Sequence, residues 1–175
     1  MARSLRITLA QLNPTVGDIR GNAEKLMAAW EQGRAAGSDI VMSSEMFLTG
    51  YSSQDMVRKH AFSRDAMAAV DELAARTAGG PALGVGAPLP DGEAVFNAFH
   101  ILSGGRVQAR IRKHHLPNYD VFDEVRQFSP GPISGPVAVN GVRIGTPICE
   151  DAWYPDVPEA LAESGAELLF VPNGS

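Results

Sequence analysis

A thiol, a carboxylate and an ammonium group each follow an apolar, β-rich run in this sequence. The only cysteine, Cys149, comes at the end of the run 142–148 and is followed directly by Glu150 and Asp151. A free cysteine is most often a small buried hydrophobe. Two acids directly after it are out of place in a segment that continues into a core, and a polar, partly exposed surrounding is where a thiol can react. Cys149 is therefore a candidate nucleophile.

The candidate carboxylate and ammonium groups are Glu45 and Lys113. Glu45 comes just past the short apolar run 39–42, although on position alone a solvated loop acid explains it equally well. Lys113 follows the run 106–112, and a surface lysine is the commoner explanation for a single residue of this type. All three candidates nevertheless follow separate predicted strands, and strand ends are where α/β proteins place their chemistry.

Composition limits the classes of protein to be considered. The 175 residues are 45% hydrophobic and 20% charged, which fits one domain with a real core. The net charge is −5 and the basic residues are scattered, so we expect neither nucleic acid nor a membrane as partner. One cysteine cannot form an internal disulfide, and no run approaches the ~18 apolar residues of a membrane span. We expect a cytoplasmic protein.

Hydrophobic periodicity predicts alternating strands and helices. Asn22 is the expected N-cap of the first helix, Ser63 is the expected cap of the apolar helical face that follows it, and the first strand is expected to be buried. Two hairpins are expected, at Ser103-Gly104-Gly105 and at Asn140-Gly141. This order predicts an α/β protein whose sheet is covered by helices on at least one face. The expected strands are 5–12, 39–42, 82–87, 94–102, 106–112, 137–139, 142–148 and 168–171, and the expected helical segments are 22–36, 52–78 and 158–165.

Two further segments need interpretation. GVGAP, residues 84 to 88, invites comparison with a dinucleotide-binding fingerprint, but the third glycine is absent, Pro88 intervenes and no helix follows. We interpret it as an ordinary strand. Residues 112–131, between the two hairpins, are rich in polar and aromatic residues and are predicted to form a long ordered loop, which is typical of a functional segment.

Three sequence blocks together resemble the nitrilase (carbon-nitrogen hydrolase) superfamily. They are SSEMFLTGY at 43–51, RKHHLPNYDVFDE at 112–124 and GTPICEDAW at 145–153, and they occur in the family's order across nearly the whole chain. Within the superfamily they are most similar to the glutaminase domains of glutamine-dependent NAD synthetases. The resemblance implies an αββα sandwich for residues 1–175. Ser44 and Met46 depart from the proline and leucine that usually flank the family's glutamate.

The resemblance also implies a role for each candidate. Cys149 would be the nucleophile and Glu45 the general base, while Lys113 and the backbone N–H of Glu150 would stabilise the oxyanion. Glu124 would be the additional acid that orients the lysine. The implied reaction is hydrolysis of the glutamine amide through a cysteine thioester, with the ammonia used in ATP-dependent amidation of deamido-NAD to NAD. The implied substrate-binding residues are Tyr51, Tyr119, Phe122, Glu150 and Ser175.

The family's domain continues past the PNGS block, and in the synthetases an ATP-dependent domain follows. We therefore expect this domain to be incomplete at its C-terminus, with ATP and Mg expected only in the synthetase domain and with no cofactor or metal here. Glutamine, the synthetase domain and further copies of the parent protein are the expected partners. A chain ending at Ser175 is expected to lack the second sheet, to expose an apolar face, to unfold with little cooperativity and to turn over negligible glutamine.

Other functions stay open on sequence alone. One is a stand-alone nitrilase-type amidase acting on another small amide, and another is an inactive nitrilase-like interaction module. A Cys-His hydrolase could use His114 or His115 as its base, although the sequence shows no Asn or Asp to orient either ring. A zinc site built from Cys149 and the two histidines lacks the usual ligand spacing.

Overall fold

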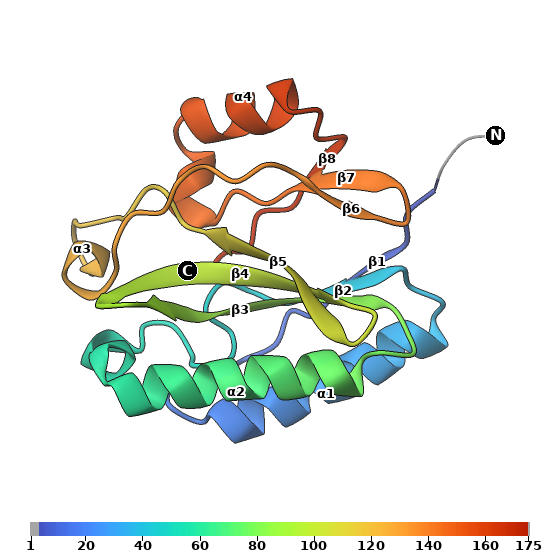
Figure 1. Ribbon diagram of the computed structural model, residues 1–175, viewed down its shortest axis with the longest axis horizontal. Coiled ribbons are helices and arrows are strands. Elements are labelled where there is room, and N and C mark those ends of the chain that lie inside the picture. The colour runs from blue at the N-terminus through green and yellow to red at the C-terminus, as the bar shows by residue number, and fades with distance from the viewer. Residues whose placement is uncertain (1–3, 175) are drawn as a thin grey trace.

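The computed structural model describes residues 4–174 and has four layers, helix, sheet, sheet and helix (Figure 1). Helices α1 and α2 cover the outer face of a five-stranded sheet of order β1-β2-β3-β4-β5, and α4 lies over a three-stranded sheet of order β6-β7-β8. The predicted αββα sandwich is confirmed.

The strands are β1 (Ile7–Leu9), β2 (Ile40–Met42), β3 (Ala82–Asp91), β4 (Ala94–Ser103), β5 (Arg106–Arg112), β6 (Val137–Val139), β7 (Val142–Gly145) and β8 (Leu168–Leu169). The helices are α1 (Ile19–Ala35), α2 (His60–Arg76), α3 (Glu124–Gln127) and α4 (Asp156–Glu163), with two 3-10 helices, η1 (Gln54–Arg58) and η2 (Cys149–Ala152).

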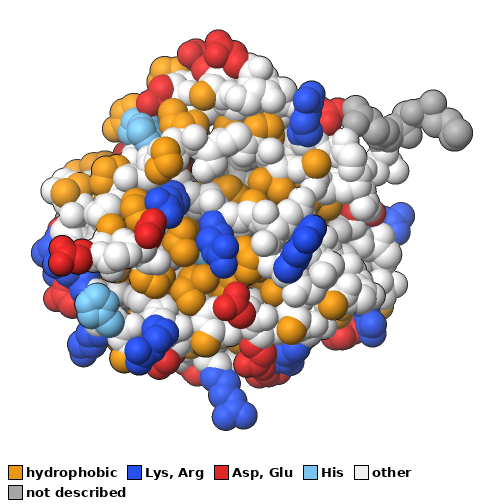
Figure 2. Space-filling model, viewed as in Figure 1, with side chains coloured by type: hydrophobic (Ala, Val, Ile, Leu, Met, Phe, Trp, Pro, Cys, Tyr) orange, Lys and Arg blue, Asp and Glu red, His pale blue; other side chains and the backbone are white. Residues whose placement is uncertain are grey.

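The connections explain the layer order. β1, β2 and β3 are parallel, and the helices α1 and α2 connect them, so both helices lie on the same face of the sheet. β3, β4 and β5 form an antiparallel meander with short turns. β6 and β7 form the second predicted hairpin, and β8 joins it in parallel. On the face drawn in Figure 2, basic and acidic side chains are interspersed.

Two apolar cores hold the layers together. One lies between α1, α2 and the five-stranded sheet and includes Leu26, Trp30 and Val85. The other lies between the two sheets and includes Phe99 of β4 and Ile144 of β7. The prediction that the second sheet would be missing from these residues is therefore wrong, because β6, β7 and β8 already supply apolar side chains that cover the inner face of the first sheet.

Two predicted helix starts are wrong. α1 begins at Ile19, and Asp18 caps it by accepting a hydrogen bond from the Gly21 N–H at 2.9 Å. The predicted cap, Asn22, is fully buried inside the helix and donates to the carbonyl of Leu48 at 3.1 Å. Ser63 likewise lies inside α2, where its hydroxyl donates to a carbonyl of η1. In both cases a short polar side chain typical of a cap bonds a neighbouring backbone segment instead.

The first strand is shorter and more exposed than predicted. Within the described part of the chain β1 is an edge strand whose partner is β2, and Leu9 is 67% exposed, so the prediction of a buried strand is wrong. In contrast, β3 continues past the predicted end through Pro88 and Pro90. The backbone of Gly86 faces the side away from β4, where it accepts from Leu48. Backbone N–H and carbonyl groups point to alternate edges of a strand, so Pro88 and Pro90 point to the same edge as Gly86. No strand of the described chain pairs with this part of that edge, so the lack of an N–H on the two prolines breaks no ladder hydrogen bond.

β7 and β8 are also shorter than the runs that predicted them, ending at Gly145 and Leu169. After Gly145 the chain leaves the ladder and reaches the backbone turn at Cys149. Among the described residues, no helix is both long enough and apolar enough to cross a membrane.

Candidate active site

A buried cluster of one ammonium and two carboxylates lies at the ends of β2 and β5. Lys113 follows β5 directly, and its Nζ donates to Glu45 Oε1 at 2.7 Å and to Glu124 Oε1 at 3.0 Å. None of the three side chains is more than 3% exposed. Burial alone lowers the pKa of Lys113, but the charges and hydrogen bonds of the two carboxylates outweigh it and raise the pKa overall. The lysine therefore stays charged at neutral pH.

Asn97, in the middle of β4, contacts every member of this cluster. Its Nδ2 donates to Glu45 Oε1 at 2.8 Å and to Glu124 Oε1 at 3.4 Å, and its backbone carbonyl accepts from the Lys113 N–H at 2.8 Å. Sequence reasoning missed this residue. The available signal was the one amide in the largely apolar run AVFNAFHIL, since a buried polar side chain needs partners.

The turn that carries Glu45 is packed tightly against β3. Met46 has a left-handed backbone, φ 47°, and is fully buried. A Cβ on Gly86 would lie 2.3 Å from the Met46 nitrogen and 2.5 Å from the Ser44 carbonyl oxygen. Gly86 therefore lets the turn approach the strand, which is a backbone role for a glycine of the GVGAP segment. Met46, one of the departures from the family's pattern, fits its position as a core side chain.

Cys149 lies at a strained backbone turn where the chain passes into η2. Its φ of 48° is uncommon for a residue with a Cβ, and such strain is concentrated at functional sites. Its N–H donates to the Pro172 carbonyl at 3.0 Å. Burial raises the pKa of the thiol to about 11, the charge of Glu45 and a hydrogen bond to it act in the same direction, and Lys113 opposes them. The resting thiol is therefore protonated and has a carboxylate beside it.

Asp151 connects the Lys113 segment to the Cys149 segment. Its Oδ1 accepts from the N–H groups of His114 at 3.0 Å and His115 at 2.7 Å. Its Oδ2 accepts from the N–H of Ile148 at 3.0 Å. Burial raises the pKa of Asp151, and these backbone donors only partly offset the rise. Sequence analysis used Asp151 only as a sign of a polar surrounding and missed this positioning role.

The predicted pocket residues form one wall beside the cluster. The Tyr119 hydroxyl donates to Glu150 Oε2 at 2.9 Å, and the Tyr119 and Phe122 rings meet edge to face at 5.6 Å. Tyr51 lies against Phe122 at 6.4 Å, and burial together with the charge of Glu124 raises its pKa. Ser175, also predicted to bind substrate, lies outside the described residues.

The residue before Ser175, Gly174, does reach the cluster. Its N–H donates to Glu45 Oε2 at 2.9 Å, and a Cβ at this position would lie 2.9 Å from the same oxygen. The two oxygens of Glu45 are thus held on separate sides, Oε1 by Lys113 and Asn97 and Oε2 by Gly174.

The two histidines after Lys113 have partners other than the thiol. His114 Nδ1 bonds the Gly131 carbonyl at 2.7 Å, and His115 Nε2 bonds the Asp156 carboxylate at 2.8 Å. This geometry gives no support to a Cys-His hydrolase. A polar cavity of about 550 Å³, lined in part by Asp39 and Asn140, lies at the opposite ends of the strands and contains none of the predicted site residues.

A thiol beside a buried carboxylate and ammonium, at the strand ends of an αββα sandwich, is the arrangement of a cysteine hydrolase. The family model for carbon-nitrogen hydrolases matches residues 6–175, and the chain belongs to this family. It is 60% identical to a glutamine-dependent NAD(+) synthetase from Rhodobacter capsulatus, an alignment that covers 100% of this chain and 32% of that protein. The identity to the synthetase of the same name from Thermotoga maritima is 34%, with 98% of this chain and 30% of that protein covered. The chain thus spans about a third of the length of these relatives.

Solved structures share the fold. The glutamine-dependent NAD+ synthetase from Acinetobacter baumannii, determined with ADP, superposes with a TM-score of 0.89 at 26% identity, over 99% of this chain and 33% of that one. An amidase from Nesterenkonia sp. AN1 superposes with a TM-score of 0.84 at 24% identity, over 97% of this chain and 67% of that one. At that identity the amidase shows the fold alone.

Proposed function

We propose that this chain is the glutamine-hydrolysing part of a glutamine-dependent NAD synthetase. The observation that carries the proposal is the Glu45–Lys113–Glu124 cluster beside the protonated Cys149 thiol, since it supplies a base, an oxyanion donor and a nucleophile at one point. The 60% identity to a protein of that name supports glutamine as the substrate.

The first half of the reaction forms a thioester. Glu45 takes the thiol proton as the Cys149 sulfur attacks the amide carbon, and the Lys113 ammonium stabilises the oxyanion that develops. The Cys149 N–H already donates to Pro172, and we assign the second oxyanion donor to the N–H of Glu150, as the family resemblance implies. The carbon–nitrogen bond then breaks, the leaving nitrogen takes the proton from Glu45, and ammonia departs.

The second half releases the acid. Glu45 removes a proton from a water molecule that attacks the thioester carbon, and Lys113 again stabilises the oxyanion. The carbon–sulfur bond then breaks, and Glu45 returns the proton to the Cys149 thiolate. Glu124 and Asn97 act as positioning residues, because both are buried and bind groups of the cluster. Tyr119 and Glu150, which a 2.9 Å hydrogen bond joins, are assigned to binding of the glutamine substrate in this proposal.

The fate of the ammonia is also part of the proposal. It is consumed in the ATP-dependent amidation of deamido-NAD to NAD by a synthetase domain of the same protein, and ATP and Mg²⁺ act there. Further copies of the protein are the remaining expected partner. The single free cysteine fits the reducing cytoplasm.

The test uses the protein at its natural length and measures NAD formation with either glutamine or ammonium as nitrogen donor. Cys149→Ala should abolish the glutamine-dependent rate and leave the ammonium-dependent rate. Loss of both rates would show that Cys149 is structural. Hydrolysis of other small amides, with no NAD formed from glutamine, would point instead to an amidase.

A further inference from the structure

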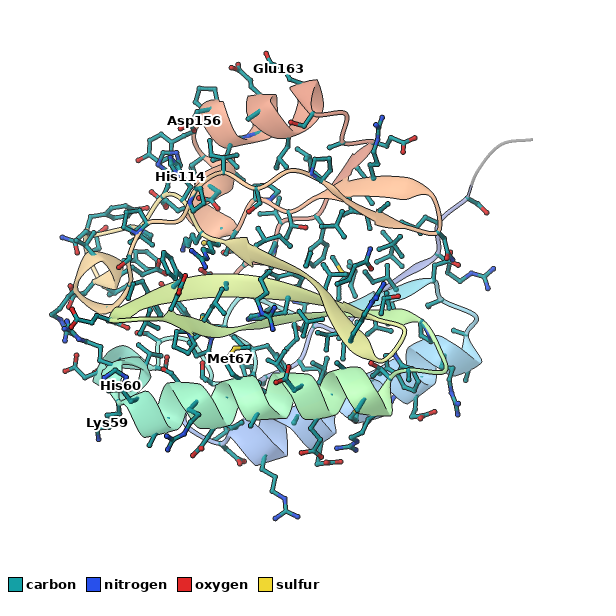
Figure 3. The ribbon with its side chains drawn as sticks, in the orientation of Figure 1. Lys59, His60, Met67, His114, Asp156 and Glu163 are labelled. Atoms are coloured by element: carbon teal, nitrogen blue, oxygen red, sulfur yellow. The ribbon has the colours of Figure 1, made fainter. Side chains whose placement is uncertain are left out.

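Outside the catalytic cluster, three ligand groups meet on the surface between the Lys113 segment and α4. They are the imidazoles of His114 and His115 and the carboxylate of Asp156, and one ligand atom from each lies within 4.8 Å of the others. Figure 3 shows His114 and Asp156 close together at the start of α4. The mechanism proposed above uses none of the three side chains.

The hydrogen bonds prepare His114 to bind a cation. A carbonyl oxygen can only accept, so the 2.7 Å contact with Gly131 places a hydrogen on Nδ1 of His114. The Nε2 lone pair of the neutral ring is then free, and this nitrogen lies 4.0 Å from Asp156 Oδ2. Metal-bound histidines are commonly held in this way, with one ring N–H donated to a backbone carbonyl and the other nitrogen on the ion.

His115 completes the set from the other side of the carboxylate. Its Nε2 lies 2.8 Å from Asp156 Oδ1 and 3.0 Å from Oδ2. Ligand atoms bound to one tetrahedral Zn²⁺ at ~2.0–2.1 Å are about 3.3 Å apart. This separation lies between the 2.8 Å from His115 to Asp156 and the 4.0 Å from His114 to Asp156. An ion would take the place of the proton now between His115 and Asp156, and the ring would carry its hydrogen on Nδ1 instead.

We infer that His114, His115 and Asp156 form a binding site for a divalent transition-metal ion of the Zn²⁺ type. Two imidazoles and one carboxylate suit Zn²⁺, whereas Mg²⁺ and Ca²⁺ prefer sets made entirely of oxygen. The side chains are 34%, 25% and 47% exposed, so an ion can enter from solvent and a water molecule can fill the fourth position. The bound ion would connect the segment after Lys113 to the first turn of α4.

The test measures Zn²⁺ binding by calorimetry and Co²⁺ binding by its visible spectrum, with the protein at its natural length. Cys149→Ser is the background, because a thiol also binds Zn²⁺. Asp156→Asn and His115→Asn should each lose one equivalent of bound Zn²⁺ or lower the affinity for Zn²⁺ by more than ~10-fold. Removal of a residue that merely orients a metal ligand already lowers affinity by about this factor. Mg²⁺ should not occupy the site.

Matched controls are available elsewhere on the surface. His60→Asn on α2 and Glu163→Gln at the far end of α4 remove the same kinds of group away from the cluster (Figure 3) and should leave binding unchanged. If His115→Asn does not fold, as judged by its thermal transition, Asp156→Asn decides alone, because its side chain is exposed. Unchanged stoichiometry and affinity in Asp156→Asn, or loss of the ion with Cys149→Ser alone, would overturn the inference.

Discussion

Among the described residues, a cation lies between two carboxylates both in the interior, at Lys113, and on the surface, at Arg126. In the interior, Lys113 lies between Glu45 and Glu124, and none of these side chains is more than 3% exposed. On the surface, Arg126 lies between Asp55 and Asp123, with side chains 45%, 68% and 49% exposed.

Because the two groups differ in burial, they differ in what they can contribute to stability. Exposed ion pairs are screened by water and salt and contribute little to stability. A buried ionic cluster requires several kcal/mol of desolvation per ion, and apolar residues of the same volume often stabilise a protein more. The interior cluster is therefore hard to explain by stability, whereas its position beside the Cys149 thiol agrees with the catalytic role proposed above.

Replacing the interior cation should have the largest effect. Lys113→Met keeps most of the side-chain volume but leaves two carboxylates facing each other, so we expect a loss of about 3–5 kcal/mol in the free energy of unfolding. Glutamine hydrolysis should fall at least ~10²-fold, as when an oxyanion donor is removed. Denaturant unfolding and turnover measure the two effects. A stable variant with near-normal turnover would remove Lys113 from the mechanism.

His100 provides a second test of buried charge, because this fully buried residue avoids ionisation. Burial lowers its pKa from 6.5 to about 4, assisted by Arg110 and opposed by a bond to the Ala87 carbonyl. As the pH falls from about 6.5 to about 4, the unfolded chain takes up a proton that the folded protein refuses, so stability falls. At about 1.4 kcal/mol per pH unit this loss is about 3 kcal/mol, and below about pH 4 it stops growing.

The matched variant for this pH dependence is His100→Gln, which cannot titrate. Its free energy of unfolding, measured between pH 7 and pH 4.5, should decline less steeply than that of the native protein. Equal slopes would mean that other groups cause the acid sensitivity.

A backbone test of the interior cluster should come next in size. Gly86→Ala forces a Cβ against the turn that carries Glu45, and overpacking of this kind costs ~1–3 kcal/mol. We expect a matching fall in glutamine hydrolysis, because the carboxylate shifts with the turn. Gly79→Ala is the control, since a Cβ there meets no atom within 4 Å. Similar thermal transitions and turnover for both variants would contradict the role given to Gly86.

The smallest effect is expected for the surface group. Arg126→Gln removes the cation between Asp55 and Asp123, yet the denaturation midpoint and the turnover should not change measurably, because solvent already screens these charges. A clear loss of stability would show that exposure is a poor guide to the energetics of this protein and would weaken the contrast between the two clusters.

Sequence reasoning predicted most elements because their patterns are local. Helical periodicity identified α1 and α2, and turn residues identified both hairpins. The misplaced caps, at Asn22 and Ser63, were wrong because their side chains bond backbone segments that only the tertiary fold brings close. The missed second sheet was a similar error, since a strand pattern does not say which sheet the strand joins.

For the site, the sequence blocks named the residues but not what positions them. Glu45, Lys113 and Glu124 do meet, whereas their catalytic roles stay predictions. Asn97 and Asp151 escaped notice because their partners come from segments more than 25 residues away, or from backbone N–H groups that leave no mark in a sequence.

The position of Asp151 has a consequence for motion in this region. One carboxylate binds the backbone just after Lys113 and the backbone just before Cys149. We therefore expect a displacement of one segment to carry the other with it. The separation between ammonium and sulfur is then expected to vary less than the position of either group relative to the rest of the fold, which favours a constant reacting distance.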